Sequence, residues 1–214
     1  MTINVLGLAI VLIVSVTSVI LHELAHGLMA LALGDQTAKM SGRLTLNPLK
    51  HIDPVMSIIV PLMLFLIGAP VFGGAKPVPI DTRNLKWREW GFALVAIAGP
   101  LMNFILAFIY FLVGHLSGTI YMSDSLLGTI CVLGMYLNIG FMLFNLIPIP
   151  PLDGSRVLYA LAPEGVRRFM AQMEAYGFIV IYVLILLGGS ILSKYMAGGQ
   201  DAIVQFFYWI VGGR

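Results

Sequence analysis

Residues 5–33 read VLGLAIVLIVSVTSVILHELAHGLMALAL, and this stretch decides the fold of the 214-residue chain. It exceeds the roughly 20 apolar residues that cross the hydrocarbon core of a bilayer, so it predicts a transmembrane helix. Residues 1–7 contain no Lys or Arg, and the apolar run is too long for the core of a cleaved secretory signal. We therefore expect the helix to be retained.

The composition of the whole chain also indicates a membrane protein. Hydrophobic residues make up 59% of the sequence and charged residues only 10%, with a mean hydropathy of +0.97. Soluble domains usually carry about 25% charged residues, so this composition excludes a soluble enzyme, a disordered chain and a disulfide scaffold. The net charge of +2 is too small to indicate nucleic-acid binding, and the one cysteine, Cys131, has no partner for an internal disulfide.

Three further apolar segments are long enough to cross a bilayer, at residues 90–116, 125–147 and 169–192. Residues 55–67 form a shorter apolar run, and runs of this length are more often re-entrant or buried than spanning. An aromatic run within residues 203–211 suits a membrane interface. We therefore expect an all-α membrane protein, a multi-pass helical bundle with a short re-entrant helix, folded as a single membrane-embedded domain over residues 1–214.

The basic residues predict the topology of this bundle. Ten of the twelve fall in the connections that the spans place on one side, and the exceptions are Lys194 and Arg214. The positive-inside rule makes that side cytoplasmic, so we expect an extracytoplasmic N-terminus in the cell membrane. Both flanks of residues 55–67 then share a compartment, which is a second reason to expect that this run enters the bilayer and returns.

Two segments before the second span predict extended backbone. Residues 40–46 alternate polar and apolar side chains, and residues 71–80 contain two prolines separated by one residue. Together they predict a small β element near the cytoplasmic side, whose edge could hold a peptide by β-addition. Non-helical backbone at membrane depth must be buried in protein or line a wet cavity, so we expect a cavity beside it.

His22-Glu23-Leu24-Ala25-His26 is an HExxH motif inside the first span. On a helix, residues i and i+4 share a face, so both imidazoles can reach one metal ion, and Glu23 is placed to take a proton from water. Ionisable groups inside a membrane are costly and mark functional sites. The motif therefore predicts a metal centre, and a catalytic zinc ion would need a third protein ligand and an open position.

Residue spacing leaves several candidates for that third ligand. Glu89, His115 and Glu174 lie at helix ends, where a solvated side chain is the simpler interpretation. Asp153 follows the third long segment, which runs from outside to inside as the first does, so it reaches the same depth as the two motif histidines. The competing role for Asp153 is that of a helix N-cap.

The sequence resembles the site-2 protease family of intramembrane zinc metalloproteases, in its short prokaryotic branch without a PDZ domain. The matching motifs are HELAH at 22–26, GRLTLNPLKHIDP at 42–54, AKPVPI at 75–80, AGPLMN at 98–103 and NLIPIPPLDG at 145–154. The resemblance implies one zinc ion per chain held by His22, His26 and Asp153, with Glu23 as the general base. It also implies cleavage of peptide bonds in or near the transmembrane segments of other membrane proteins.

Other polar residues and functions stay open at this point. Asn145 opens the motif that ends at Asp153, so it serves either substrate or oxyanion binding or an interhelical hydrogen bond. We expect Asn103 to serve helix packing and His51 to bond loop backbone. The alternative functions are a metal-binding membrane transporter and a catalytically inactive scaffold. The sequence has no internal repeat of the kind that many transporters have, and every expected catalytic residue is present.

Overall fold

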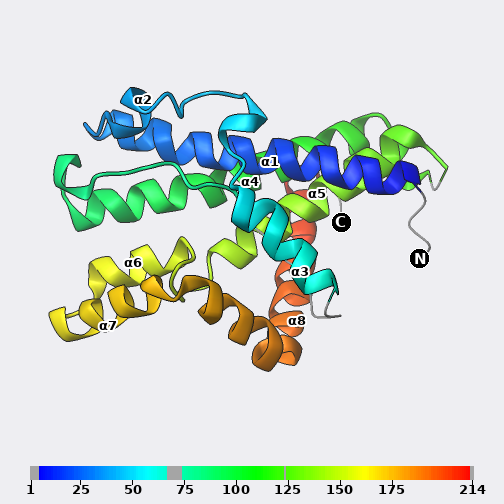
Figure 1. Cartoon of the computed structure of the whole chain (residues 1–214). Helices are drawn as coiled ribbons and strands as arrows, with labels where there is room; N and C mark the ends of the chain where they lie inside the picture. Colours follow the sequence, from blue (N-terminus) through cyan, green and yellow to red (C-terminus); the bar gives the residue numbers. More distant parts are fainter. Residues whose placement is uncertain (1–4, 67–73, 123, 213–214) are drawn as a thin grey trace.

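The computed structural model describes residues 5–66, 74–122 and 124–212, and these residues are mostly helical (Figure 1). Four helices are long and apolar enough to cross a membrane. They are α1 (Val5–Ala32), α4 (Glu89–Leu116), α5 (Leu126–Asn145) and α8 (Gly177–Ile210). The prediction of a helical protein with four long apolar helices is confirmed.

Shorter helices lie in the connections. Between α1 and α4 the chain forms α2 (Thr37–Met40), a π-helix (Pro54–Ile59) and α3 (Val60–Leu66). Between α5 and α8 it forms α6 (Gly154–Leu161) and α7 (Glu164–Ala175). Single 3-10 turns occur at Pro48–Lys50, Thr82–Asn84 and Thr119–Tyr121.

Local sequence signals explain where the long helices begin and end. α1 ends shortly before Gly34, whose φ of +105° lies in a region that glycine adopts readily. α5 begins after Ser125, whose side chain accepts a hydrogen bond from the Gly128 N–H as an N-cap. α5 ends at Asn145, because the prolines that follow lack the N–H groups that would continue it.

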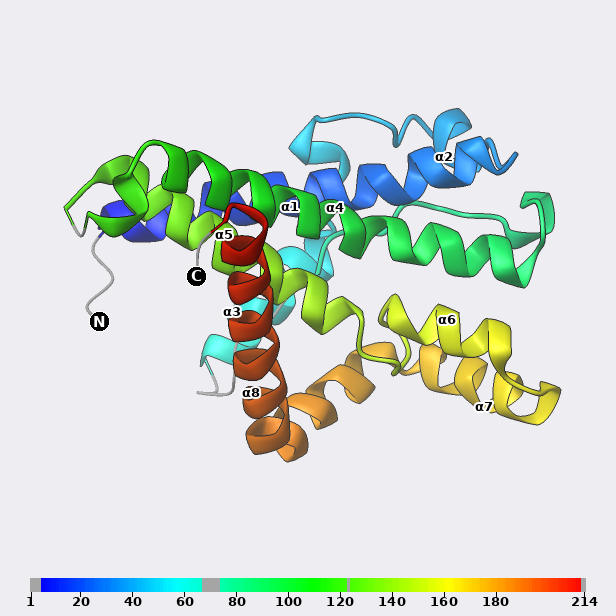
Figure 2. The ribbon, with the colours of Figure 1, turned by 180° about the vertical axis from the view of Figure 1, so that it is seen from behind.

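α1, α4 and α5 lie side by side in the centre of the molecule, with α4 antiparallel to the other two (Figures 1 and 2). Small buried residues such as Ala30 and Ala107 let these helices approach closely. One apolar cluster joins α4 and α5 to the end of α8, and its members are Ala107, Phe111, Met135, Ile139, Met142, Leu143 and Phe207.

The C-terminal third of the chain differs from the predicted boundaries. The sequence predicts a span over residues 169–192 and a separate interfacial run over 203–211, whereas α8 is one helix that includes most of both. Residues 169–175 of the predicted span belong to α7, a helix whose charged residues Arg167, Arg168 and Glu174 suit a surface position.

α8 also reaches further into the protein than an interfacial segment would. Figure 2 shows it bent into two limbs, and Gly188-Gly189-Ser190 near its middle is the kind of sequence at which helices bend. Phe207 on the second limb is fully buried against α4 and α5, while Trp209 remains 72% exposed. Only part of the aromatic run is therefore free to face an interface.

The predicted β element is wrong for the residues that the structure describes. Residue 40 ends α2, residues 41–46 form a turn and bends, and residues 74–80 are extended without pairing as a strand. The two prolines of the second segment have no N–H to donate, and the Lys76 N–H is bonded to the carbonyl of His51 at 2.8 Å. Residues 71–73 of the predicted segment lie outside the described residues.

The short helix predicted over residues 55–67 is present as the π-helix and α3, which together run from Pro54 to Leu66. Ile67 lies outside the described residues. That this short helix enters the bilayer and returns stays a prediction.

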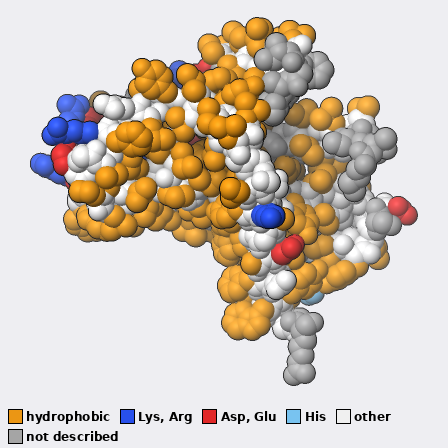
Figure 3. Space-filling model, turned by 90° about the horizontal axis from the view of Figure 1, so that it is seen from below, with side chains coloured by type: hydrophobic (Ala, Val, Ile, Leu, Met, Phe, Trp, Pro, Cys, Tyr) orange, Lys and Arg blue, Asp and Glu red, His pale blue; other side chains and the backbone are white. Residues whose placement is uncertain are grey.

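Hydrophobic side chains dominate the face seen in Figure 3, and Lys and Arg side chains gather at one end of it. Large apolar residues are exposed on the long helices, for example Leu12 on α1, Leu101 on α4 and Leu187 on α8. Exposed apolar surface of this extent is typical of helices that contact lipid.

Candidate metal centre

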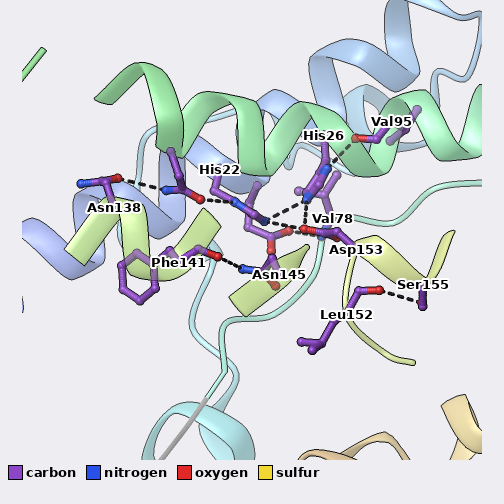
Figure 4. Close-up of polar contacts among 12 residues, drawn as sticks. His22, His26, Val78, Val95, Asn138, Phe141, Asn145, Leu152, Asp153 and Ser155 are labelled. Carbon is purple, nitrogen blue, oxygen red and sulfur yellow. Dashed lines mark hydrogen bonds and ion pairs between the residues drawn. The ribbon is translucent and has the colours of Figure 1, made fainter. Parts of the chain in front are cut away.

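Three side chains from two distant parts of the sequence meet at one point (Figure 4). His22 Nε2 lies 3.0 Å from His26 Nε2 and 3.1 Å from Asp153 Oδ2, and His26 Nε2 lies 3.4 Å from the same carboxylate oxygen. Both histidines are 7% exposed. The structure thus brings together the two motif histidines and the aspartate that the resemblance implied.

The backbone explains how each ligand reaches this point. His22 and His26 are one turn apart on α1, with ring centroids 4.5 Å apart and perpendicular planes. Asp153 stands directly before α6, and its side chain makes no capping hydrogen bond there, so the N-cap role does not apply. Gly154 folds back onto the end of α5, where a Cβ atom would lie 2.2 Å from the Leu146 carbonyl oxygen.

Groups on α4 orient both imidazoles through hydrogen bonds to their Nδ1 atoms. His26 Nδ1 lies 2.7 Å from the carbonyl oxygen of Val95, which can only accept, so Nδ1 donates. His22 Nδ1 lies 2.6 Å from Asn103 Oδ1 and donates to it. Each ring therefore carries its proton on Nδ1 and turns the lone pair of Nε2 toward the shared point. Such outer partners fix the ring orientation of metal-binding histidines.

Gly99 allows α4 to approach this closely. A Cβ atom at this position would lie 2.4 Å from His26 Nε2 and 2.6 Å from His22 Cε1. Any side chain larger than hydrogen would therefore collide with the two rings at their metal-facing edge.

Glu23 lies beside the three ligand atoms without joining them. Its Oε2 accepts a hydrogen bond from the Val78 N–H at 2.8 Å, so the extended segment 74–80 touches the motif directly. Glu23 is half-buried and lines the same cavity as the histidines. The geometry leaves this carboxylate available as a base rather than as a ligand.

A cavity of about 340 Å³ opens onto this group of residues. It is lined by the three ligands and Glu23, by the extended segment at Pro77, Val78 and Ile80, and by Asn145. The expectation of a cavity beside the extended segment is confirmed. Arg156 and Glu174 also line a second cavity of about 450 Å³. These two side chains are ion-paired.

The other three candidate ligands have partners outside this group. His115 Nδ1 is 2.9 Å from the Tyr121 hydroxyl, and Glu89 lies 3.8 Å from Arg167. Glu174 pairs with Arg156 at the cavity wall. None of the three belongs to the group that could hold a metal ion within the described residues.

Three further polar residues were weighed from the sequence. His51 Nε2 donates to the Thr45 carbonyl at 2.9 Å, so the expected loop role of His51 is confirmed. Asn145 donates from Nδ2 to the Phe141 carbonyl at 3.0 Å while lining the cavity. Asn103 does more than the packing expected of it, because it holds His22. The one sequence signal for this was its place at the end of the AGPLMN motif.

The chemistry of the donor atoms tests whether the site fits a metal ion. Because both histidine protons are on Nδ1, the two Nε2 atoms carry only lone pairs. Asp153 Oδ2 is buried and receives no hydrogen bond from the described residues. Three acceptor atoms this close repel one another unless a cation lies among them. Tetrahedral zinc with bonds of about 2.0–2.2 Å needs ligand atoms roughly 3.3–3.6 Å apart, which is close to the three separations observed.

Comparisons with known proteins show which family the chain belongs to. A profile of peptidase family M50 matches residues 115–188, which include Asn145 and Asp153. The chain is 43% identical over 207 residues to "Putative zinc metalloprotease YwhC" of Bacillus subtilis, with 94% of this chain and 90% of the relative covered. It is 31% identical over 170 residues to "Putative zinc metalloprotease Rip2" of Mycolicibacterium smegmatis, covering 79% of this chain and 63% of the relative.

A third relative is archaeal. "Putative zinc metalloprotease MJ0611" of Methanocaldococcus jannaschii is 36% identical over 101 residues, which cover 47% of this chain and 50% of that protein. No solved structure matches significantly. With its helices, its three converging ligands and a relative that aligns over nearly its whole length, the chain belongs to peptidase family M50, the site-2 protease family.

Proposed function

We propose that this protein is an intramembrane zinc metalloendopeptidase that uses His22, His26 and Asp153 as zinc ligands and Glu23 as general base. The observation that carries the proposal is the meeting of three lone-pair donors beside the Glu23 carboxylate, which is not one of them, all lining one cavity between apolar helices. The substrates are peptide bonds in or near transmembrane segments of other membrane proteins.

Each step of the proposed hydrolysis depends on particular residues of the chain. Zinc, when bound, supplies a Lewis acid that activates water and polarises the scissile carbonyl. Glu23 takes the proton of the attacking water and hands it to the leaving amine. The Val78 N–H holds Glu23 Oε2, which leaves Oε1 to face the reacting atoms. Asn145 also lines the cavity, where its amide can contact the substrate or the developing oxyanion.

The extended segment 74–80 is the proposed holder of the substrate. Peptide bonds in a helix are shielded, so a substrate helix must unwind before it is cut. One carbonyl of the segment is already occupied, because the Lys76 carbonyl accepts from Arg43 Nη2 at 2.6 Å. Within residues 77–79 the only N–H is that of Val78, since the other two residues are prolines. A substrate strand would therefore pair mainly through its own N–H groups and the segment's carbonyls.

We also propose the orientation of the protein in the cell membrane. Its N-terminus is extracytoplasmic, and the metal centre lies in the cytoplasmic half of the bundle. The clustering of ten basic residues in the connections on one side supports this orientation. The short helix Pro54–Leu66 enters the bilayer from the cytoplasmic side and returns.

The alternatives are less well supported. A transporter would need no carboxylate beside its metal ligands, and an inactive scaffold would not keep Glu23, the open position and the cavity together. Cleavage separates them: purified protein should cut single-span membrane substrates, and a zinc chelator should abolish the cut. Zinc uptake into vesicles without any cleavage would contradict the protease and favour the transporter.

Glu23→Gln and His22→Ala should both be inactive for different reasons. Gln keeps the shape of Glu but cannot accept the proton, so cleavage should fall by about 10²–10⁴ while zinc stays bound. His22→Ala leaves two ligands, so zinc should be lost. Metal analysis of the two purified variants separates the cases. Near wild-type cleavage by Glu23→Gln would remove Glu23 as the base.

A further inference from the structure

A chain of hydrogen bonds runs from α5 through α4 to the metal centre. Asn138 on α5 donates from Nδ2 to the Gly134 carbonyl at 2.8 Å. Its Oδ1 accepts from Asn103 Nδ2 at 3.0 Å, and Asn103 Oδ1 faces His22 Nδ1 at 2.6 Å. Both asparagines are fully buried at 0% exposure.

The direction of every bond in this chain follows from its first acceptor. The Gly134 carbonyl can only accept, so the NH₂ group of Asn138 must face it and the amide oxygen must face Asn103. That oxygen can in turn only accept, so Asn103 turns its NH₂ group toward Asn138 and its oxygen toward His22. The His22 proton is then required on Nδ1, and the lone pair on Nε2.

We propose that Asn138, which touches neither the metal nor any of its ligands, is a positioning residue that sets the proton position of His22 through Asn103. The proposal rests on the proposed metal site. Without Asn138, the Asn103 amide is free to turn over and present its NH₂ group to His22. His22 would then accept at Nδ1 and carry its proton on Nε2, the atom that must bind the metal.

Because both asparagines are buried, each of these hydrogen bonds depends on its protein partner. Neither asparagine is exposed, so solvent cannot replace a missing partner or stabilise a turned amide. A purely structural role, as an interhelical hydrogen bond between α4 and α5, would instead weaken folding and leave zinc affinity unchanged. Zinc affinity therefore separates the two roles.

The first test measures zinc affinity of the purified full-length protein by competition with a chelator. Asn138→Leu should bind zinc about tenfold more weakly, at the lower end of the range for outer partners of metal ligands. Thr129→Val is the matched control, because Thr129 lies on the same helix and its hydroxyl also donates to the carbonyl four residues before it. The control should bind zinc as tightly as the wild type.

The second test restores the acceptor without restoring Asn138. In Asn138→Leu/Asn103→Asp, a carboxylate has acceptor oxygens on both sides and cannot offer a donor to His22. Zinc affinity should return to within a few-fold of the wild type. If the double variant stays as weak as Asn138→Leu, the polarity argument is wrong and α4–α5 packing is the cause.

A third measurement leaves Asn138 and Asn103 unchanged, so it holds even if Asn138→Leu fails to fold. In zinc-bound wild-type protein with ¹⁵N-labelled histidine, His22 should show a hydrogen-bonded Nδ1–H, assigned by its loss in His22→Gln. His26, bonded to Val95, is the internal reference. A His22 Nδ1–H that exchanges freely with solvent would overturn the proposed role of Asn138.

The outcomes also separate this proposal from the proposed function. Absence of zinc binding in the wild type, or binding that survives in His22→Ala, contradicts the metal site itself. Tight zinc binding in the wild type together with unchanged zinc affinity in Asn138→Leu contradicts only the proposed role of Asn138.

Discussion

At the scale of single residues, the close packing of α4 at Gly99 shapes the proposed metal centre. It is the position of α4 that faces both imidazoles, and the absence of a side chain there is what lets the helix supply Val95 and Asn103 as their partners. The ligand geometry therefore depends on a residue that has no functional group of its own.

Gly99→Ala should disrupt the metal centre with little effect on helix content. The added methyl would lie 2.4 Å from His26 Nε2 and displace the ring, so the variant should lose most of its zinc and its cleavage activity. Gly189→Ala is the control, because a Cβ there meets nothing within 4 Å on α8. Zinc content and circular dichroism measure the two effects. Full zinc content in Gly99→Ala would show that α4 can move away without harm.

Asp35 is a second residue whose environment has a measurable consequence. It is fully buried after α1 and accepts hydrogen bonds from the Thr37 N–H and hydroxyl, the Asp81 N–H and Asn84 Nδ2. Burial raises the pKa of the Asp35 carboxyl, but these bonds outweigh it, so the pKa lies below its usual value. The ionised carboxylate thus fastens the end of α1 to the segment that precedes α4.

Stability should depend on pH through Asp35. Because the folded pKa is depressed, its contribution is complete above the unfolded value of about 4 and is lost as pH falls through the folded value. Thermal unfolding in detergent should be level down to about pH 5 and decline below it. Asp35→Asn should lower stability by about 1–3 kcal/mol at pH 7 and flatten the decline. Asp201→Asn, at an exposed position on α8, should reproduce the wild-type curve.

At the scale of elements, the extended segment 74–80 is held by several neighbouring elements. Ser57 Oγ on the π-helix donates to the Gly74 carbonyl at 2.7 Å, and Arg43 in the loop after α2 donates to the Lys76 carbonyl. The Val78 N–H donates to Glu23 on α1. The segment therefore links Glu23, the proposed general base, to the loop after α2 and to the short helix.

Val78→Pro removes this one N–H between two prolines that already favour extended backbone. Glu23 should lose its fixed orientation, and cleavage should fall about tenfold or more, because small misplacements of catalytic groups are costly. Val78→Ala keeps the N–H and should stay within a few-fold of the wild type. Steady-state cleavage of a single-span substrate compares the two. Equal rates would show that the Val78 amide does not position the base.

At the scale of the whole molecule, the four long helices and the charge distribution set a testable topology. The only native cysteine, Cys131, is 1% exposed, so single cysteines can be introduced against a low background. Ser41→Cys and Thr82→Cys, both at exposed positions, should be labelled from the cytoplasmic side. Ser117→Cys, between α4 and α5, should be labelled from the other side. Labelling of Ser41→Cys and Thr82→Cys from opposite sides would mean that Pro54–Leu66 crosses the bilayer.

The membrane class, the number of long helices and the placing of His22 and His26 on one helix face could all be predicted from the sequence. These features depend on local properties, namely the length of apolar runs and the spacing of four residues that places His22 and His26 on one face. Where the local signal was mixed, prediction failed. Alternating polarity over residues 40–46 resembles a strand, but strand pairing also requires a partner edge, which the neighbouring prolines do not provide.

Which distant groups surround His22 and His26 could be learned only from the packing of the helices. Asn103 and Val95 lie far from the motif in sequence, and they reach its rings because Gly99 lets α4 pack against α1. Asn138 acts one helix further away, through a bond direction that no local pattern encodes. The physical reason is that hydropathy and helical spacing act along one element, whereas a hydrogen bond between buried groups depends on how three elements are placed to within a few tenths of an ångström.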